Sequence, residues 1–221
     1  MKSIASRKVL RVKGAGRSAG SRAAILRAAG HIFAEKGLEG ARTDAIAAAA
    51  GVNKALLYYY FKSKDDLYLA ILEGHMKDFS EQASRILSSE GPAGATLLRY
   101  VSMHFDFMSA RPDYPRLVQR FMMARGRPFE RLARKYSLPV GAKFRSVIER
   151  GIRAGEFRVS DSYHTAISLA ALTSFYFGAA PILRVASRID PYDEAQLARR
   201  KKEVLTFIRH ALFRNPEACS K

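Results

Sequence analysis

Apolar residues recur along most of this chain at the three- and four-residue spacing of amphipathic helices. The first clear stripe consists of Ile25, Ala28, Ala29, Ile32 and Phe33. Such a stripe indicates a helix with one buried face, and we expect Ser21 to cap its start and Gly37 its end. Short alternating patterns between turn residues, which would indicate strands, are scarce. The sequence therefore predicts an all-α fold.

Two short helices and a longer one are predicted after residue 40. Thr43 is expected to cap the first short helix, which ends at Gly51, and the second covers about 53–61. Ser63, with Asp66 three residues later, forms a capping-box pattern. This pattern predicts the start of a fourth helix, which we expect to continue to about residue 90.

Prolines and glycines divide the rest of the chain into longer helical patterns. The predicted helical segments are 93–110, 113–124, 128–154, 161–187 and 193–213. Pro139 lies inside the third of these segments and is expected to kink or split it. The whole pattern predicts an arm at 1–20, a small helical domain at 21–68, a larger helical domain at 69–215 and a tail at 216–221.

The charge is strongly positive and unevenly distributed. Lys and Arg number 38 against 20 Asp and Glu, a net charge of +18 over 221 residues. Residues 1–64 hold 13 of these cations and three acids, which is more than half of the excess. A compact cationic end favours a polyanionic partner, because neutralising phosphates releases condensed counterions. The basic arm is expected to be flexible, either as a disordered tail or as an arm that orders on DNA.

Composition argues against several other classes of protein. No run of about 18 apolar residues occurs, and residues 1–20 lack the apolar core of a secretory signal, although a mitochondrial-type transit peptide stays open. The single cysteine, Cys219, allows no intrachain disulfide and suits a reducing cytoplasm. The five histidines are isolated and no catalytic motif occurs, so we expect no enzyme, no cofactor and no metal site.

The two short helices have the proportions of a helix-turn-helix. The small alanines 47–50 allow the first helix to pack closely, and Gly51 suits a turn with unusual dihedral angles. Leu57 and Phe61, at i and i+4, are expected to face inward. In so short a helix the tyrosines at 58–60 cannot all be buried, so at least one faces solvent or DNA.

The stretch from Ser21 to Leu67 resembles the DNA-binding region of the tetracycline-repressor (TetR) family. The matching motifs, in order along the chain, are IFAEKG, TDAIA, AGVNK and LYYYFKSKDDL. The resemblance covers roughly a fifth of the chain. It implies a homodimeric transcriptional regulator, with a three-helix DNA-binding domain and a larger helical domain that dimerises and holds an effector cavity.

The family pattern also implies roles for individual residues. The hydroxyl and backbone N–H of Thr43 would meet a phosphate, Lys54 would reach a guanine edge or a phosphate, and Tyr59 would contact a thymine methyl or a sugar. The implied DNA-binding residues are Arg42, Thr43, Lys54, Ala55, Tyr58, Tyr59, Tyr60, Lys62 and Lys64. Leu56 departs from the family, which usually has a small hydroxyl residue there, and this favours apolar contact or packing.

Two C-terminal helices are expected to build the dimer. The segment ISLAALTSFYFGAAPIL is apolar on nearly every side, and the last helix has apolar residues at heptad-like spacing. The expected interface residues are Ala170, Ser174, Gly178, Leu197, Val204, Leu205, Ile208 and Leu212. The alternative is that these residues form an internal core.

Aromatic and methionine side chains in the larger domain suit an apolar cavity with few polar anchors, with ordinary core packing as the alternative. The candidate pocket residues are Tyr100, His104, Phe105, Phe107, Met108, Phe121, Met122, Met123, Tyr163, His164, Phe175 and Tyr176. The expected partners are double-stranded operator DNA, a hydrophobic or aromatic effector and a second copy of the chain. A sequence-indifferent DNA-binding protein without an effector is the alternative. A membrane-surface protein is disfavoured, because the arm lacks bulky apolar residues at helical spacing.

Overall fold

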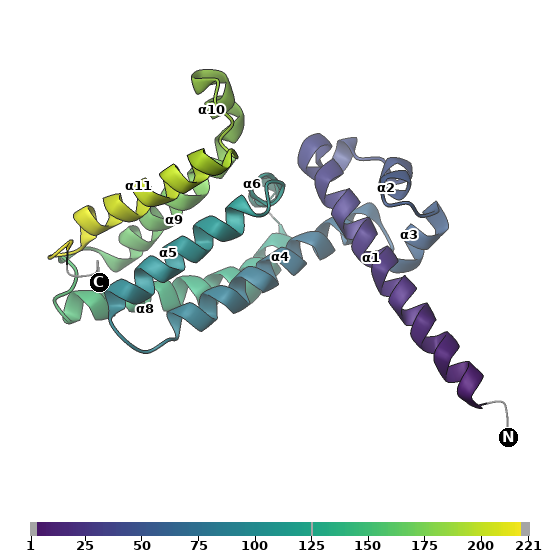
Figure 1. Cartoon of the computed structure of the whole chain (residues 1–221), viewed down its shortest axis with the longest axis horizontal. Coiled ribbons are helices and arrows are strands. Elements are labelled where there is room, and N and C mark those ends of the chain that lie inside the picture. Colours follow the sequence, from purple (N-terminus) through teal and green to yellow (C-terminus); the bar gives the residue numbers. More distant parts are fainter. Residues whose placement is uncertain (1–3, 125, 218–221) are drawn as a thin grey trace. The chain divides into compact units, whose positions relative to one another are not determined.

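The computed structural model describes residues 4–124 and 126–217 (Figure 1). Over these residues every regular element is a helix, apart from one isolated bridge between Phe157 and Phe213. The predicted all-α fold is therefore confirmed. The chain divides into two compact units between Glu73 and Gly74, and the sequence placed this boundary at 68–69.

The first unit is a small helical domain. It contains α1 (Ile4–Gly40), α2 (Thr43–Ala49), α3 (Lys54–Tyr60) and the start of α4 (Lys64–Leu87). Its core is made by Ile25, Ala29, Phe33, Ile46, Leu57, Phe61, Leu67 and Leu72. These side chains come from all four helices, so the predicted apolar stripe of the first helix has its partners on the following three.

Helix α1 differs from its prediction at its start. It begins at Ile4, so Ser21 lies inside the helix and does not cap it. Residues 4–20, which were expected to form a flexible basic arm, belong to this helix, and residues 1–3 lie outside the described residues. The segment contains no proline, and extending an existing helix adds a hydrogen bond per residue without a new nucleus. Gly37, by contrast, interrupts the helix with a left-handed φ of 72°, at the position of the predicted cap.

The second unit is a larger helical bundle. After α4 it contains α5 (Ala93–Ser109), α6 (Tyr114–Ala124), α7 (Arg127–Leu132), the π-helix η1 (Ala133–Ser137), α8 (Leu138–Arg153), α9 (Ser162–Gly178), α10 (Ala180–Ser187) and α11 (Glu194–Leu212). Helices α5, α8 and α9 pack on one another, and α11 covers α5 and α9. The end of α4 joins this core through the buried Ala83 and Leu87.

Two of the predicted helical segments are divided in the structure. The segment 128–154 becomes α7, η1 and α8, with Pro139 near the start of α8, so the predicted split is confirmed. The segment 161–187 becomes α9 and α10, which are bent by 64° at a break where Pro181 is the second residue of α10. Among the described helices no single one is long and apolar enough to cross a membrane, and α9 with α10 meets that criterion only as a bent pair.

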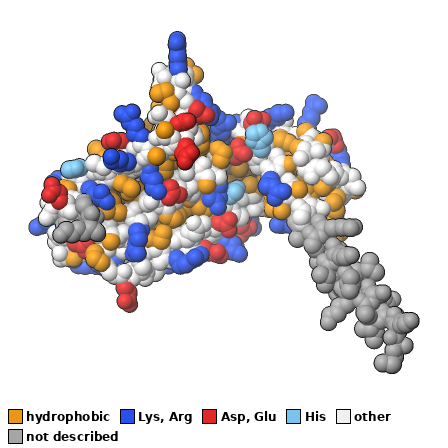
Figure 2. All heavy atoms as spheres, viewed as in Figure 1, with side chains coloured by type: hydrophobic (Ala, Val, Ile, Leu, Met, Phe, Trp, Pro, Cys, Tyr) orange, Lys and Arg blue, Asp and Glu red, His pale blue; other side chains and the backbone are white. Residues whose placement is uncertain are grey.

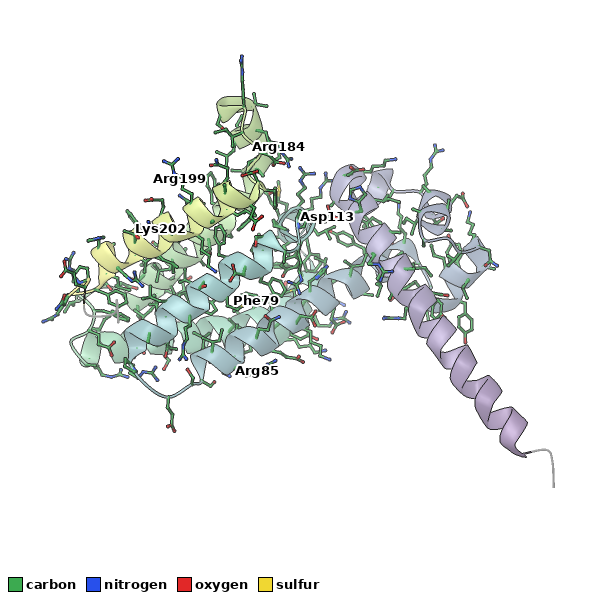
Figure 3. The ribbon with its side chains drawn as sticks, viewed as in Figure 1. Phe79, Arg85, Asp113, Arg184, Arg199 and Lys202 are labelled. Atoms are coloured by element: carbon green, nitrogen blue, oxygen red, sulfur yellow. The ribbon has the colours of Figure 1, made fainter. Side chains whose placement is uncertain are left out.

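A buried polar pair joins α5 to α9 inside the bundle. The Oγ1 of Thr173 lies 2.8 Å from Nδ1 of His104 and also donates to the carbonyl of Ala170. Because the hydroxyl has one proton, Nδ1 of His104 must donate to Thr173. Phe79 of α4, which is labelled in Figure 3, packs on the same imidazole with a ring separation of 5.1 Å. Burial lowers the pKa of His104 to about 4, so the ring is neutral at pH 7.

Replacing this histidine by glutamine tests its buried, neutral state. His104→Gln keeps an N–H that can donate to Thr173 but cannot become charged. The folded pKa of about 4 lies below the ordinary 6.5, so the stability that His104 contributes is complete above pH 6.5 and is lost as pH falls toward 4. From pH 7 to 4.5 the wild type should lose about 2.5 kcal/mol more free energy of unfolding than the variant. Urea titrations at both pH values measure this, and equal losses would contradict the buried neutral imidazole.

Candidate functional site

The rotation of α3 about its own axis is set by two buried side chains. Leu57 is fully buried and Phe61, one turn later, is nearly so. Residues one turn apart lie on the same side of a helix, so the opposite side must face solvent. The outward side carries the exposed residues Lys54, Ala55, Tyr58 and Tyr59. These four residues were all predicted to be DNA contacts, and they share one face.

Local interactions fix the turn before α3 and the start of the helix after it. Gly51 has a φ of 66°, which turns the chain after α2. The Asn53 side chain then accepts a hydrogen bond from the Leu56 N–H at 2.7 Å and caps α3. At the start of α4, Ser63 accepts from the Asp66 N–H at 3.0 Å, as the capping-box pattern predicted.

Exposure distinguishes the three consecutive tyrosines. Tyr59 is 79% exposed and Tyr58 is also exposed, whereas Tyr60 is partly buried. The expectation that at least one tyrosine faces outward is therefore confirmed. The hydroxyl of Tyr58 lies 3.4 Å from Oγ1 of Thr43, so two hydroxyl groups from α2 and α3 are adjacent at the surface.

Thr43 begins α2 but does not cap it. The residue at the N-cap position is Arg42, which has extended dihedral angles and no capping side-chain bond. The expected cap is therefore wrong by one position. The cause is that Thr43 already has helical geometry, and its hydroxyl faces Tyr58.

An ion pair that was not predicted involves the first residue of α3. The ammonium of Lys54 lies 2.8 Å from a carboxylate oxygen of Asp44 on α2, and both side chains are well exposed. The hydrogen bond to Asp44 and its charge raise the pKa of Lys54. Residues 1–64 contain 13 cations and only three acids, one of which is Asp44. This excess of cations was the feature of the sequence from which an ion pair of Asp44 could have been expected.

The other predicted cations lie in two different environments. The Lys64 ammonium donates to the carbonyls of Glu39 and Ala41, both at 3.3 Å, and so ties the α1–α2 connection to α4. Arg42 and Lys62 are exposed, and the described residues provide neither with an ion pair. Arg42 and Lys62 thus remain accessible to an anion, while Lys64 has a structural role as well.

The predicted pocket residues do not form one cavity. Tyr100, His104, Phe105 and Phe121 are buried in the core, as the core-packing alternative held. Met122, Tyr163 and Phe175 are instead exposed, because the core of the bundle is filled without them. A groove of about 470 Å³ does bring together Met108 and Val118 with Met122, Ser174, Phe175 and Gly178, between α6 and α9.

A second groove, of about 660 Å³, includes one of the predicted pocket residues, Phe107, but its other lining residues were not predicted. It lies along α4 and α5 and has a mixed lining, with the apolar Ile86 and Met103 beside the polar Gln82, Ser102 and Asp106. Arg99 and Arg111 also line it, and the Arg111 guanidinium stacks 3.8 Å over the Phe107 ring. The polar lining residues do not recur at a regular spacing in the sequence, so no pattern predicted this groove.

The dimer prediction requires a correction on α11. Val204, Ile208 and Leu212 are buried in the core of their own unit, so they have no surface left for a partner. An amphipathic helix has one apolar face, and α5 and α9 already occupy it. Leu197 and Leu205 are also partly buried against the chain's own core. The predicted α9 residues are Ala170, Ser174 and Gly178, of which the last two line the α6–α9 groove.

Much of the uncovered apolar surface of the second unit lies on α9, α10 and the turn after α10, where the large exposed side chains are Tyr163, Ile167, Phe175, Ile182, Val185 and Ile189. Other exposed apolar side chains of this unit are Met122 and Met123 on α6, Leu138 on α8, Val159 before α9, and Phe207 on α11. Phe175 alone is 72% exposed. Hydrophobic side chains are visible at the surface of the second unit in Figure 2.

Comparisons with known proteins agree with the arrangement of the two units. Residues 25–71 match the family model described as bacterial regulatory proteins, tetR family. Residues 94–208 match the model of the tetracyclin repressor-like C-terminal domain. Together these matches cover most of the chain.

Similar proteins include named transcription regulators. The chain is 27% identical over 188 residues to the HTH-type transcriptional repressor NicS of Pseudomonas putida, covering 83% of this chain and 86% of NicS. Its fold is similar to the ketosteroid regulator KstR2 of Mycobacterium tuberculosis, with a TM-score of 0.74, 18% identity and coverage of 88% and 95%. It is also similar to FadR of Bacillus subtilis, solved with stearoyl-CoA, with a TM-score of 0.63, 18% identity and coverage of 83% and 97%. The chain therefore belongs to the TetR family of bacterial transcriptional regulators.

Proposed function

We propose that this protein is a homodimeric repressor that binds operator DNA through α2 and α3 and is released by a small, mostly apolar effector in the cytoplasm. The exposed face of α3 carries the proposal, because it presents a cation and two tyrosines around the small Ala55 while Leu57 anchors the opposite side. A short helix presented in this way fits the major groove of DNA. The naming of NicS as a repressor supports the direction of control.

Each exposed residue has a role in this proposal. Lys54 and Ala55 lie at the start of α3, where a recognition helix contacts base edges. The paired hydroxyls of Thr43 and Tyr58 offer hydrogen bonds to a phosphate. Lys62 adds a cation beyond the end of α3. The outward ring of Tyr59 offers an apolar face to a thymine methyl or a sugar.

The apolar surface of α9 and α10 supports a dimer. Six large side chains, each about half to three quarters exposed, offer on the order of 600 Å² per copy. A standard interface needs about 800 Å² from each partner, so these residues supply most of that area. Ala170, Ser174 and Gly178 are small enough to let the backbones of two α9 helices approach closely. A dimer would place two recognition helices on one two-fold-related operator.

The α4–α5 groove supports an effector that acts through α4. A ligand in the groove would touch Gln82 and Ile86, which belong to the same helix as the Ser63 cap of the DNA-binding unit. The volume of about 660 Å³ suits a small molecule. The structure of FadR with stearoyl-CoA supports an effector with a large apolar part. Such a ligand must bind two states of the dimer with different affinity in order to release DNA.

A salt-titrated fluorescence anisotropy assay tests the proposal on the DNA upstream of the protein's own gene, with a random duplex as the control. A specificity ratio above about 10³, with two protomers per site, would support an operator-binding dimer. Equal affinity for both duplexes would favour the alternative of a sequence-indifferent DNA-binding protein. Absence of binding at low salt would exclude both.

Removing one exposed cation should weaken binding to every duplex. Lys62→Ala should lower the slope of log affinity against log salt by about one unit, because one phosphate contact is lost. Tyr58→Phe should weaken binding by roughly 1 kcal/mol, about fivefold, with an unchanged salt slope. Anisotropy at several salt concentrations measures both. Loss confined to one DNA sequence would instead identify a base contact.

The Asp44–Lys54 ion pair should restrain DNA binding. Asp44→Asn keeps the shape of the side chain, removes a negative charge and releases Lys54, so affinity should rise about three- to tenfold at low salt. The gain should disappear when Lys54→Ala is also present, because the released cation is then absent. The same gain in both backgrounds would show that Asp44 acts by its charge alone.

Placing a charge on the uncovered face of α9 should dissociate the dimer. Phe175→Glu should raise the dimer dissociation constant about 30-fold or more, the scale of a hot spot of about 2 kcal/mol. Sedimentation velocity over a concentration series measures the constant. Leu138→Glu, which charges an exposed site at the start of α8, is the control. Equal constants for the two variants would place the dimer interface elsewhere.

A further inference from the structure

Helix α10 projects from the bundle and is exposed on nearly all sides (Figure 1). Among the described elements, α9 is the one with which it makes an extensive contact. Ile182 and Val185, three residues apart on one face, are 62% and 76% exposed. The helix has eight residues, which is well below the length at which an isolated helix is stable in water. Its own packing therefore does not account for its order.

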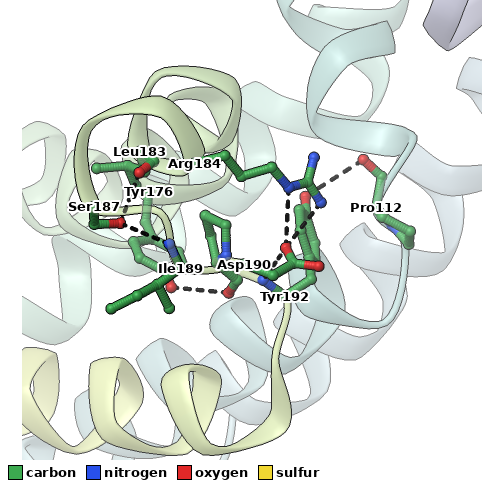
Figure 4. Close-up of polar contacts among 9 residues, drawn as sticks. Pro112, Tyr176, Leu183, Arg184, Ser187, Ile189, Asp190 and Tyr192 are labelled. Atoms are coloured by element: carbon green, nitrogen blue, oxygen red, sulfur yellow. Dashed lines mark hydrogen bonds and ion pairs between the residues drawn. The ribbon is translucent and has the colours of Figure 1, made fainter.

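A polar cluster centred on Asp190 holds α10 from its C-terminal side (Figure 4). Oδ1 of Asp190 accepts hydrogen bonds from Nε and Nη2 of Arg184 at 3.1 and 2.9 Å, and from the Tyr192 N–H at 3.0 Å. The backbone N–H of Tyr192 and then the Arg184 guanidinium lower the pKa of Asp190. The charged carboxylate of Asp190 thus links α10 to the chain that leads into α11.

Two tyrosine hydroxyls connect this cluster to the bundle. The Tyr192 hydroxyl donates to the carbonyl of Pro112 at 3.4 Å, just before α6. The Tyr176 hydroxyl, from α9, donates to the carbonyl of Pro191 at 2.8 Å. These contacts restrict the direction of α10 but leave its apolar side chains uncovered. An ordered helix with an uncovered apolar face is preorganised for a partner, since little ordering entropy is lost on docking.

The apolar face of α10 continues the surface proposed for the dimer. Ile182 of α10 and Phe175 of α9 both line the α6–α9 groove. A two-fold interface brings the same surface of each copy together. A second copy seated on α9 therefore also meets α10. Ile182, Val185 and Ile189 lie on α10 or just after it, so about half of the apolar area proposed for the dimer depends on α10.

From these observations we infer that α10 is a dimerisation arm, whose Ile182–Val185 face packs on a second copy of this chain, and that the Asp190 cluster sets its direction. This inference rests on the proposed homodimer. The arm enlarges the interface beyond α9 and stiffens it, because each copy contributes a helix clamped to its own bundle. The arm binds a second protomer, on the apolar surface that α9 and α10 of that protomer form.

The main test compares two valines of nearly equal exposure. Val185 on α10 is 76% exposed and Val159, between α8 and α9, is 79% exposed. Val185→Glu should raise the dimer dissociation constant about tenfold or more in sedimentation velocity, and Ile182→Glu should act similarly. Val159→Glu should leave the constant at the wild-type value. Circular dichroism should show the same helix content in all variants, because each site is at the surface.

The outcomes distinguish the role of α10 from the existence of the dimer. If Phe175→Glu dissociates the dimer while Val185→Glu and Ile182→Glu behave like Val159→Glu, the arm is refuted and the proposed dimer stands. If the wild type is monomeric at every concentration up to its solubility limit, both are refuted. If the α10 variants raise the dimer dissociation constant and Val159→Glu leaves it unchanged, both the arm and the dimer are supported.

A second measurement does not depend on charged substitutions. In wild-type protein, hydrogen exchange of the amides at 182–190 should be slower above the dimer dissociation constant than below it. Equal exchange at both concentrations would refute docking of the arm. Asp190→Asn should raise the dissociation constant several-fold, because the Arg184 ion pair is lost. This effect should vanish in the Val185→Glu background, and an unchanged effect there would refute the positioning role of Asp190.

Discussion

The burial of Leu57 and Phe61 is the constraint on which the proposed DNA-binding face depends. An α-helix advances about 100° per residue, so fixing one inward residue per turn fixes the direction of all the others. A rotation by one residue would expose Leu57 and bury Tyr58, and the core of the first unit would lose a side chain at its centre. The arrangement of Lys54, Ala55 and Tyr59 on the surface is thus a consequence of hydrophobic packing on the opposite side.

Electrostatics adds a second level to this face. Asp44 holds the Lys54 ammonium at 2.8 Å, and the adjacent hydroxyls of Thr43 and Tyr58 provide neutral donors. An exposed ion pair of this kind contributes little to stability. In the proposed complex its effect is instead on recognition, because DNA would compete with Asp44 for the Lys54 ammonium. The turn at Gly51 and the cap at Asn53 bring these residues of α2 and α3 together.

In the second unit, the apolar side chains that stay exposed are those on helix faces that no neighbouring helix covers. Leu169, Thr173 and Phe177 line the buried side of α9, while Phe175 on the same helix is uncovered. Helix α11 packs its main apolar face on its own bundle and leaves Phe207 exposed. Six further large exposed apolar side chains lie on α9, α10 and the turn after α10, and they form the surface proposed for the dimer. Helix α4 links the two units in the sequence, since the Ser63 cap lies in one and Leu87 is buried in the other.

Features that depend on neighbouring residues were determined by the sequence itself: the all-α fold, the breaks at Gly37 and Pro139, the cap at Ser63, and the TetR-family motif with the inward face of α3. Each rests on backbone geometry or on helical periodicity, which act over a few residues. The roles of Val204 and Ile208, the separation of Tyr100 from Phe175, and the Asp44–Lys54 pair were decided only by the tertiary structure. An apolar position shows that a side chain will be buried, but not by which neighbour. That choice depends on which helix faces meet, and residues far apart in the chain decide it.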